Sequence, residues 1–141
     1  MRLGGIDIPE AQAGPVAHSD GDVLLHALCD ALLGAAALGD IGRHFPDTDP
    51  AYRGIDSVEL LRRVVELLRE HNLRPHNVDC MLILERPKIA PYREAIRARI
   101  AGTTGLPIER VSVKATTNEG LGPIGAGEGV AAYAVVSVAE A

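Results

Sequence analysis

The chain has 141 residues, a length that fits a single domain, and we expect one domain over residues 1–141. Hydrophobic residues make up 47% of it and aromatic residues only 3%, so a packed core must be built from aliphatic side chains. The net charge of −5 argues against a nucleic acid or an anionic membrane as partner, because both need a basic surface. No apolar run is long enough to span a bilayer and no signal-peptide pattern is present, so we expect a cytoplasmic protein.

The first half of the chain predicts one strand and two helices. Residues 1–13 are expected to form a short strand and a turn. A first helix should begin after Ser19, whose hydroxyl can cap it, and should stop at Gly39. The polar segment 40–54 is rich in Pro and Asp and is expected to lack regular structure. Ser57 should cap a second helix that ends near Asn72.

The second half predicts the rest of a sheet. We expect a strand at 77–84, a helix with Pro91 in its first turn and Gly105 at its end, and strands at 111–116 and 130–138. A Gly-rich loop, 119–129, precedes the last strand. The order predicts an α/β (α+β) sandwich, one mixed β-sheet with helices on one face. The last strand is apolar on both faces, so its second face should be buried in an oligomer.

Two polar clusters lie on the first helix, and each has two possible interpretations. At the start, His18, Ser19 and Asp22 either hold a phosphate at the backbone N–H groups or only cap the helix. Further on, Asp22, His26 and Asp30 share one stripe of the helix. His26 is either a zinc ligand oriented by a carboxylate or part of a solvated face. Cys29 and Cys80 lie in apolar stretches and are expected to be free and buried.

Three loops could supply a binding site. The segment 40–50 carries three Asp residues, which are either functional or only turn formers. The segments 85–88 and 114–120 lie at the ends of two strands, and because ligands of α/β sheets bind at strand ends, these two loops could share one pocket. Two Thr, an Asn and a Glu in the last segment offer phosphate donors and an oxygen ligand for Mg²⁺, although T-T-N-E is also an ordinary turn.

Taken together, these stretches resemble the 2-C-methyl-D-erythritol 2,4-cyclodiphosphate synthase family. The matching segments are A-H-S-D-G-D-V-L-L-H-A-L-C-D-A-L-L-G at 17–34, L-G-D-I-G-R-H-F-P-D-T-D-P at 38–50, E-R-P-K at 85–88 and V-K-A-T-T-N-E-G-L-G at 113–122. The resemblance implies a homotrimer with active sites between subunits. It also implies a cyclising lyase of non-mevalonate isoprenoid biosynthesis. Its substrate would be 4-diphosphocytidyl-2-C-methyl-D-erythritol 2-phosphate, and CMP would leave.

The resemblance also implies residue roles. His26 corresponds to a zinc ligand, and Glu119 to a ligand of a second divalent cation, Mg²⁺ or Mn²⁺. His18 and Thr117 correspond to residues that stabilise the transition state. Implied contacts to the substrate are made by these two and by Ser19, Asp40, Ile41, Gly42, Phe45, Pro46, Asp47, Thr48, Asp49, Leu84, Glu85, Arg86, Pro87, Lys88, Ile89, Ala90, Thr116, Asn118 and Glu119.

One feature of the family is not matched by this sequence. Family members carry a D-x-H pair that supplies two further zinc ligands, and a catalytic zinc site needs three protein ligands. Our hypothesis is that Met1 is an internal methionine, so that the chain is truncated at its N-terminus relative to the family. Two alternatives stay open: an impaired trimer that binds cytidine nucleotide without cyclising its substrate, and a truncated product that aggregates through an unpaired strand edge.

Overall fold

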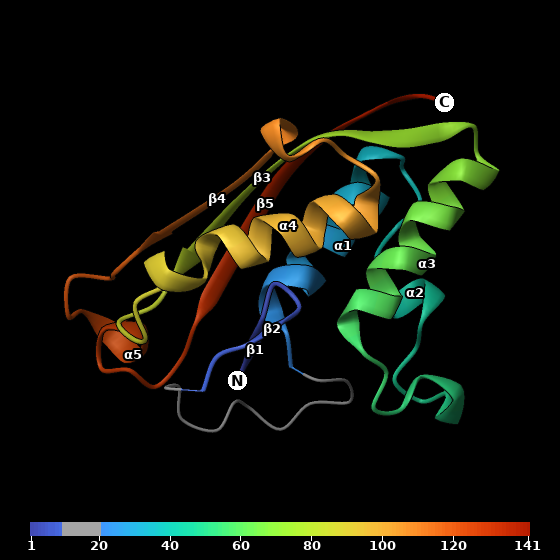
Figure 1. The fold of residues 1–141 in the computed structure, drawn as a ribbon. Helices are drawn as coiled ribbons and strands as arrows, with labels where there is room; N and C mark the ends of the chain where they lie inside the picture. The colour runs from blue at the N-terminus through green and yellow to red at the C-terminus, as the bar shows by residue number, and fades with distance from the viewer. Residues whose placement is uncertain (10–20) are drawn as a thin grey trace.

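A three-stranded mixed sheet forms the centre of the fold in a computed structural model that describes residues 1–9 and 21–141 (Figure 1). β3 (Leu73–Ile83) lies in the middle, between β4 (Val111–Thr116) and β5 (Ala131–Glu140). It pairs with β4 in parallel and with β5 in antiparallel orientation. The prediction of a mixed sheet is therefore confirmed.

The first strand does not join that sheet. β1 (Arg2–Leu3) and β2 (Ile6–Asp7) pair with each other instead, as an antiparallel hairpin. Gly4 and Gly5 form its turn with φ angles of 60° and 78°, a region that glycine enters without steric cost. The prediction of a single sheet was wrong here, because a tight glycine turn lets the two short strands pair with each other.

The main helices cover one face of the sheet, as predicted (Figure 1). α1 (Val23–Ala35) packs on β5, α3 (Ser57–Glu70) on β3, and α4 (Arg93–Thr104) on β4. The core lies between these two layers and is almost entirely aliphatic. Its fully buried members include Leu24, Leu25, Leu28, Leu32, Leu61, Leu68, Leu82, Ile96 and Ile100. Cys29 and Cys80 are free and buried in the same core, as expected.

The other face of the sheet is exposed in the single chain. On β5, the side chains of Tyr133 and Val135 are 61% and 72% exposed. On the neighbouring strands, Lys114 Nζ forms an ion pair with Asp79 Oδ2 at 3.0 Å. The last strand is thus apolar on both faces, as the sequence indicates, and only one face is covered by this chain.

The two helix starts differ from the prediction by a few residues. α1 begins at Val23, and its cap is Asp22, which accepts the Leu25 N–H at 3.1 Å. α3 begins at Ser57 itself, and Asp56 caps it by accepting the Val58 N–H at 2.8 Å. In both cases a nearby aspartate takes the role expected of a serine, because a carboxylate caps a helix equally well. Ser19 lies outside the described residues.

The helix ends and loops also needed correction. α1 ends at Ala35 and not at Gly39, since Ala36 is its C-cap. α3 ends at Glu70, close to the expected Asn72. Gly105, at a φ of 78°, ends α4 as predicted. Among the other elements are α2 (Ile41–His44) and η1 (Pro50–Tyr52) in the segment expected to be irregular, η2 (Ala90–Tyr92) around Pro91, η3 (Ile108–Arg110), and α5 (Gly122–Gly125) within the Gly-rich loop.

No helix in the described parts of the chain is long and apolar enough to cross a membrane.

Candidate active site

The carboxyl ends of β3 and β4 bring two of the predicted loops together. These strands are parallel and in register, with Ile83 opposite Thr116. The ladder continues by one more bond, because the Leu84 N–H donates to the Thr116 carbonyl at 3.0 Å. Segments 84–90 and 116–120 therefore leave the sheet side by side, and we call them the strand-end cluster. The two loops therefore lie next to each other, and a pocket shared by them stays a prediction.

The turn after β4 exposes a hydroxyl and a carboxylate that could contact a ligand. Thr117 and Glu119 are both exposed, and the Glu119 N–H donates to Thr117 Oγ1 at 3.2 Å. The side-chain amide of Asn118 donates from Nδ2 to the Leu121 carbonyl at 2.8 Å and closes the turn. Glu119 has a φ of 54°, which costs a non-glycine residue about 1–2 kcal/mol. A hydroxyl and a carboxylate on a held turn can contact a phosphate and a hard cation.

The segment after β3 is anchored by its apolar residues. Leu84 and Ile89 are buried, while Arg86, Lys88 and Ala90 are exposed. The Arg86 guanidinium lies against Gly127, because a Cβ added at Gly127 would be 3.0 Å from a guanidinium nitrogen of Arg86. The peptide bond between Arg86 and Pro87 is cis. Because Arg86 and Lys88 are exposed, this segment can offer two cationic side chains, as well as backbone groups, to a ligand.

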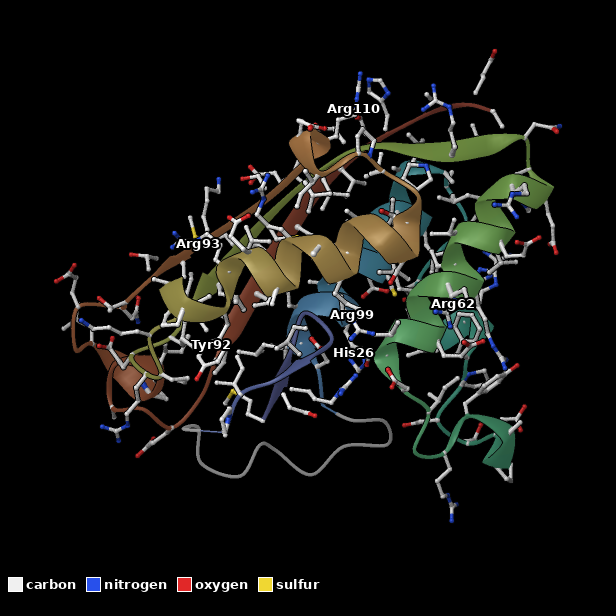
Figure 2. The ribbon with its side chains drawn as sticks, in the orientation of Figure 1. His26, Arg62, Tyr92, Arg93, Arg99 and Arg110 are labelled. Atoms are coloured by element: carbon white, nitrogen blue, oxygen red, sulfur yellow. The ribbon has the colours of Figure 1, made fainter. Side chains whose placement is uncertain are left out.

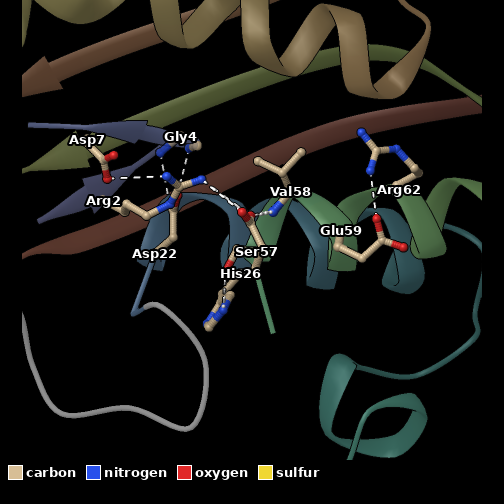
Figure 3. A network of polar contacts seen from close by, with 11 residues as sticks. Arg2, Gly4, Asp7, Asp22, His26, Ser57, Val58, Glu59 and Arg62 are labelled. Carbon is tan, nitrogen blue, oxygen red and sulfur yellow. Dashed lines mark hydrogen bonds and ion pairs between the residues drawn. The ribbon is translucent and has the colours of Figure 1, made fainter. Parts of the chain in front are cut away.

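His26 projects from α1 beside the start of α3 (Figures 2 and 3). Its Nε2 lies 2.9 Å from the hydroxyl of Ser57, which is fully buried. Sequence reasoning saw Ser57 only as a helix cap and missed this contact, because 31 residues separate the two. The Ser57 hydroxyl fixes the direction of the imidazole.

The two carboxylates on the His26 stripe both hold distant backbone. Asp22 is completely buried and accepts the N–H groups of Gly4 at 3.0 Å and Gly5 at 2.7 Å, which ties the hairpin turn to α1 (Figure 3). Asp30 accepts the Ile41 N–H at 2.9 Å and so positions the segment after α1. These bonds give both aspartates a structural role that the helical spacing did not indicate.

Two of the three aspartates of the predicted loop are caps as well. Asp40 accepts the Arg43 N–H at 2.9 Å and caps α2, and Asp49 accepts the Ala51 N–H at 2.9 Å and caps η1. Phe45 meets Tyr52 edge to face, with ring centroids 5.3 Å apart. We call residues 40–49, with His26 and Ser57, the helix cluster.

The structure divides the predicted site residues into these two clusters. α5, next to the strand-end cluster, and η1, which follows the helix cluster, lie on opposite sides of the chain in Figure 1. One chain therefore does not bring all the predicted residues to one place. His18 and Ser19 lie outside the described residues.

Metal ligands are scarce in residues 1–9 and 21–141. No group of three or more His, Cys, Asp or Glu side chains there could hold a metal ion. A zinc site takes three protein ligands and an open position. Among the described residues, His26 is the zinc ligand expected from the family resemblance, and the exposed carboxylate of Glu119 suits a single contact to Mg²⁺ or Mn²⁺.

Comparison with known proteins gives consistent matches. Residues 1–139 match the model of the YgbB family. The 2-C-methyl-D-erythritol 2,4-cyclodiphosphate synthase of Thioalkalivibrio sulfidiphilus is 64% identical over 136 residues, covering 96% of this chain and 84% of the relative. The enzyme of the same name from Chlorobaculum tepidum is 58% identical, covering 99% of this chain and 88% of the relative.

Solved structures show the same fold. A 2C-methyl-D-erythritol-2,4-cyclodiphosphate synthase in a CDP-bound form matches with a TM-score of 0.89 at 41% identity, over 99% of this chain and 89% of the other. The bifunctional IspDF of Campylobacter jejuni matches with a TM-score of 0.94 at 42% identity, over 100% of this chain and 38% of the other.

Proposed function

Because the chain belongs to the YgbB family, we propose that it converts 4-diphosphocytidyl-2-C-methyl-D-erythritol 2-phosphate into 2-C-methyl-D-erythritol 2,4-cyclodiphosphate and CMP. The observation that carries this is the 64% identity to a synthase of that name over 96% of the chain. The related structure in a CDP-bound form supports a cytidine nucleotide as ligand. The alternative of a nucleotide-binding protein without activity has no support in these similarities, because the relatives are named as synthases.

The proposed reaction is an intramolecular phosphoryl transfer. An oxygen of the 2-phosphate attacks the β-phosphorus and forms the new P–O bond. The bond from the β-phosphorus to the bridging oxygen breaks, and CMP leaves with that oxygen. Since nucleophile and electrophile belong to one molecule, the enzyme has mainly to fold the substrate and to stabilise charge on the phosphates.

The strand-end cluster suits the diphosphate and the cytosine in this reaction. The Thr117 hydroxyl would donate to an equatorial oxygen of the transferred phosphoryl group, with Thr116 beside it. Segment 84–90 would hold cytosine through its backbone. A divalent cation at Glu119, when bound, would neutralise charge on the diphosphate.

The helix cluster suits the other end of the substrate. Asp40, Ile41 and Gly42 would contact the ribose region, and residues 45–49 would cover the methylerythritol part. His26 would serve as a zinc ligand together with ligands from outside the described residues. His18 and Ser19 would contact phosphate. These roles are carried over from the family resemblance.

We also propose that the complete site lies between two copies of the chain in a homotrimer. The strand-end cluster and residues 40–49 of the helix cluster lie toward opposite sides of one chain, so a second copy would be needed to bring them together. The exposed apolar side chains of Tyr133 and Val135 would be buried by such assembly. The cytoplasm remains the proposed compartment.

The function is tested by following CMP release and the cyclic product by ³¹P NMR, with zinc and Mg²⁺ present. The wild-type chain should form both products in equal amounts. Thr117→Ala should lower kcat by about 10²-fold, since a donor to the transition state is lost. The matched control is Thr103→Ala, a half-buried threonine on α4 whose hydroxyl donates to the Arg99 carbonyl. A substrate that stays linear with the wild-type chain would contradict the proposal.

A further inference from the structure

The Glu85 side chain reaches from the end of β3 to the turn that follows β4. Its Oε1 accepts the Asn118 N–H at 2.8 Å and the Gly120 N–H at 3.4 Å. Leu84, the residue before Glu85, is held by the sheet, because its side chain is buried and its N–H donates to the Thr116 carbonyl. The carboxylate therefore reaches the turn from a rigid base, and bonds to an ionised acceptor are about twice as strong as neutral ones.

The turn has a backbone shape that needs this support. Glu119 and Gly120 both have positive φ angles, 54° and 73°, and the conformation is unfavourable for Glu119 because it has a Cβ. Three successive N–H groups have acceptors: those of Asn118 and Gly120 bond to Glu85, and that of Glu119 bonds to Thr117 Oγ1. Two of these three bonds depend on the Glu85 side chain.

A second contact holds the turn from α5. A Cβ added at Gly125 would overlap the carbonyl carbon of Gly120 and lie 2.8 Å from its Cα. The backbone of Gly120 therefore packs directly on that of Gly125, and only a glycine leaves room for it. The turn is held by a carboxylate at the end of β3 and by a close backbone contact with α5.

From this arrangement we propose that Glu85 is a positioning residue for the proposed reaction. It holds Thr117 and Glu119 in place through its bonds to Asn118 and Gly120. This inference rests on the proposed function, and it gives the Glu85 side chain a role other than the contact to cytosine expected for segment 84–90. The carboxylate acts on the substrate only through the turn that it holds.

The test compares Glu85→Ala with Glu85→Gln, which keeps an acceptor oxygen without the charge. Glu85→Ala should lower kcat for CMP release by about 10–100-fold and raise the Mg²⁺ concentration needed for half-maximal rate, as is usual when a supporting residue is lost. Glu85→Gln should recover most of both losses. The affinity for CDP, measured by calorimetry, should change by less than about threefold. Glu109→Ala, an exposed glutamate of η3, is the matched control.

Gly125→Ala displaces the turn from the other side and leaves Glu85 intact. It should reproduce the loss in kcat, and this variant keeps the inference testable if Glu85→Ala does not fold. Equal kcat defects in Glu85→Ala and Glu85→Gln, with the Asn118 and Gly120 amides of Glu85→Gln exchanging as slowly as in the wild type, would show that the charge itself is used and would overturn the inference. A loss of CDP affinity with unchanged kcat would overturn it as well.

A readout without turnover separates this inference from the proposed function. Hydrogen exchange of the Asn118 and Gly120 amides, followed by NMR, should become at least about tenfold faster in Glu85→Ala than in the wild type. Unchanged exchange at both amides would refute the positioning role even if the wild-type chain is an active synthase. A wild-type chain that releases no CMP, with faster exchange in the variant, would refute the proposed function alone.

Discussion

The buried carboxylate of Asp22 connects the N-terminal hairpin to the start of α1, and its removal tests that connection. The side chain has no exposed surface and accepts three backbone N–H groups, those of Gly4, Gly5 and Leu25, at 3.0, 2.7 and 3.1 Å. In Asp22→Ala these donors lose this acceptor. An unsatisfied buried donor costs about 1–3 kcal/mol, and a lost helix cap costs about 1 kcal/mol.

Because water can reach part of the hairpin turn after the change, we expect less than the full sum. The free energy of unfolding of Asp22→Ala should fall by about 3–5 kcal/mol, which is a large part of the stability of an ordinary domain. The chain has no Trp, so urea unfolding is best followed by circular dichroism. If the variant is too unstable to purify, exchange of the Gly4 and Gly5 amides in Asp22→Asn gives a local measure of the same connection.

The matched control is Asp7→Ala in the same hairpin. The Asp7 side chain is 81% exposed and pairs with Arg2 at 3.3 Å, so its loss should cost less than about 1 kcal/mol. If Asp22→Ala lost no more stability than Asp7→Ala, the reasoning from buried hydrogen bonds would be refuted.

Three further predictions concern a thiol, an ion pair and the exposed face of the sheet. Burial raises the pKa of Cys80 to about 12, so iodoacetamide at pH 8 should label it only after denaturation; rapid labelling of the native protein would contradict this. A hydrogen bond from Arg62 lowers the pKa of Glu59, so the pair stabilises the fold above the ordinary pKa of 4.5, and that contribution is lost as the pH falls through the lower, folded value. The free energies of unfolding of Glu59→Gln and wild type, measured by urea titration, should therefore differ slightly at pH 7, by at most about 0.5 kcal/mol, and converge near pH 3. Val135→Asp should leave the circular dichroism spectrum unchanged and convert a trimer to monomers in light scattering, and an unchanged mass would count against the proposed interface.

Those parts of the fold that depend on local patterns could be predicted from the sequence. The alternation of Val111 and Val113 with polar residues gave the strand Val111–Thr116 with its observed bounds. Gly105 ended its helix because a left-handed residue was needed there. The caps could not be assigned in the same way, since a serine and an aspartate stood close together and both residue types cap helices well.

The parts of the site that were not predicted depend on contacts between residues far apart in the sequence. Parallel strands end at the same edge, so the neighbourhood of the two strand-end loops followed from the order of elements. The bonds of Asp22 to the hairpin and of Asp30 to Ile41 did not, because helical spacing shows only which residues share a face. The contact between His26 and Ser57 and the bond of Glu85 to Asn118 link residues more than thirty positions apart, and no local pattern indicates them.

The parallel register of β3 and β4 limits how the chain can change in length. Ile83 lies opposite Thr116, and the bonds of Glu85 begin directly beyond that pair. One residue inserted into β4 would turn the side chains beyond it to the opposite face, so that Lys114 would point into the aliphatic core. The same insertion would carry the turn about 3.3 Å further along the strand, out of reach of the carboxylate. In this half of the chain, insertions should therefore be tolerated at η3 or after α5, but not within β4.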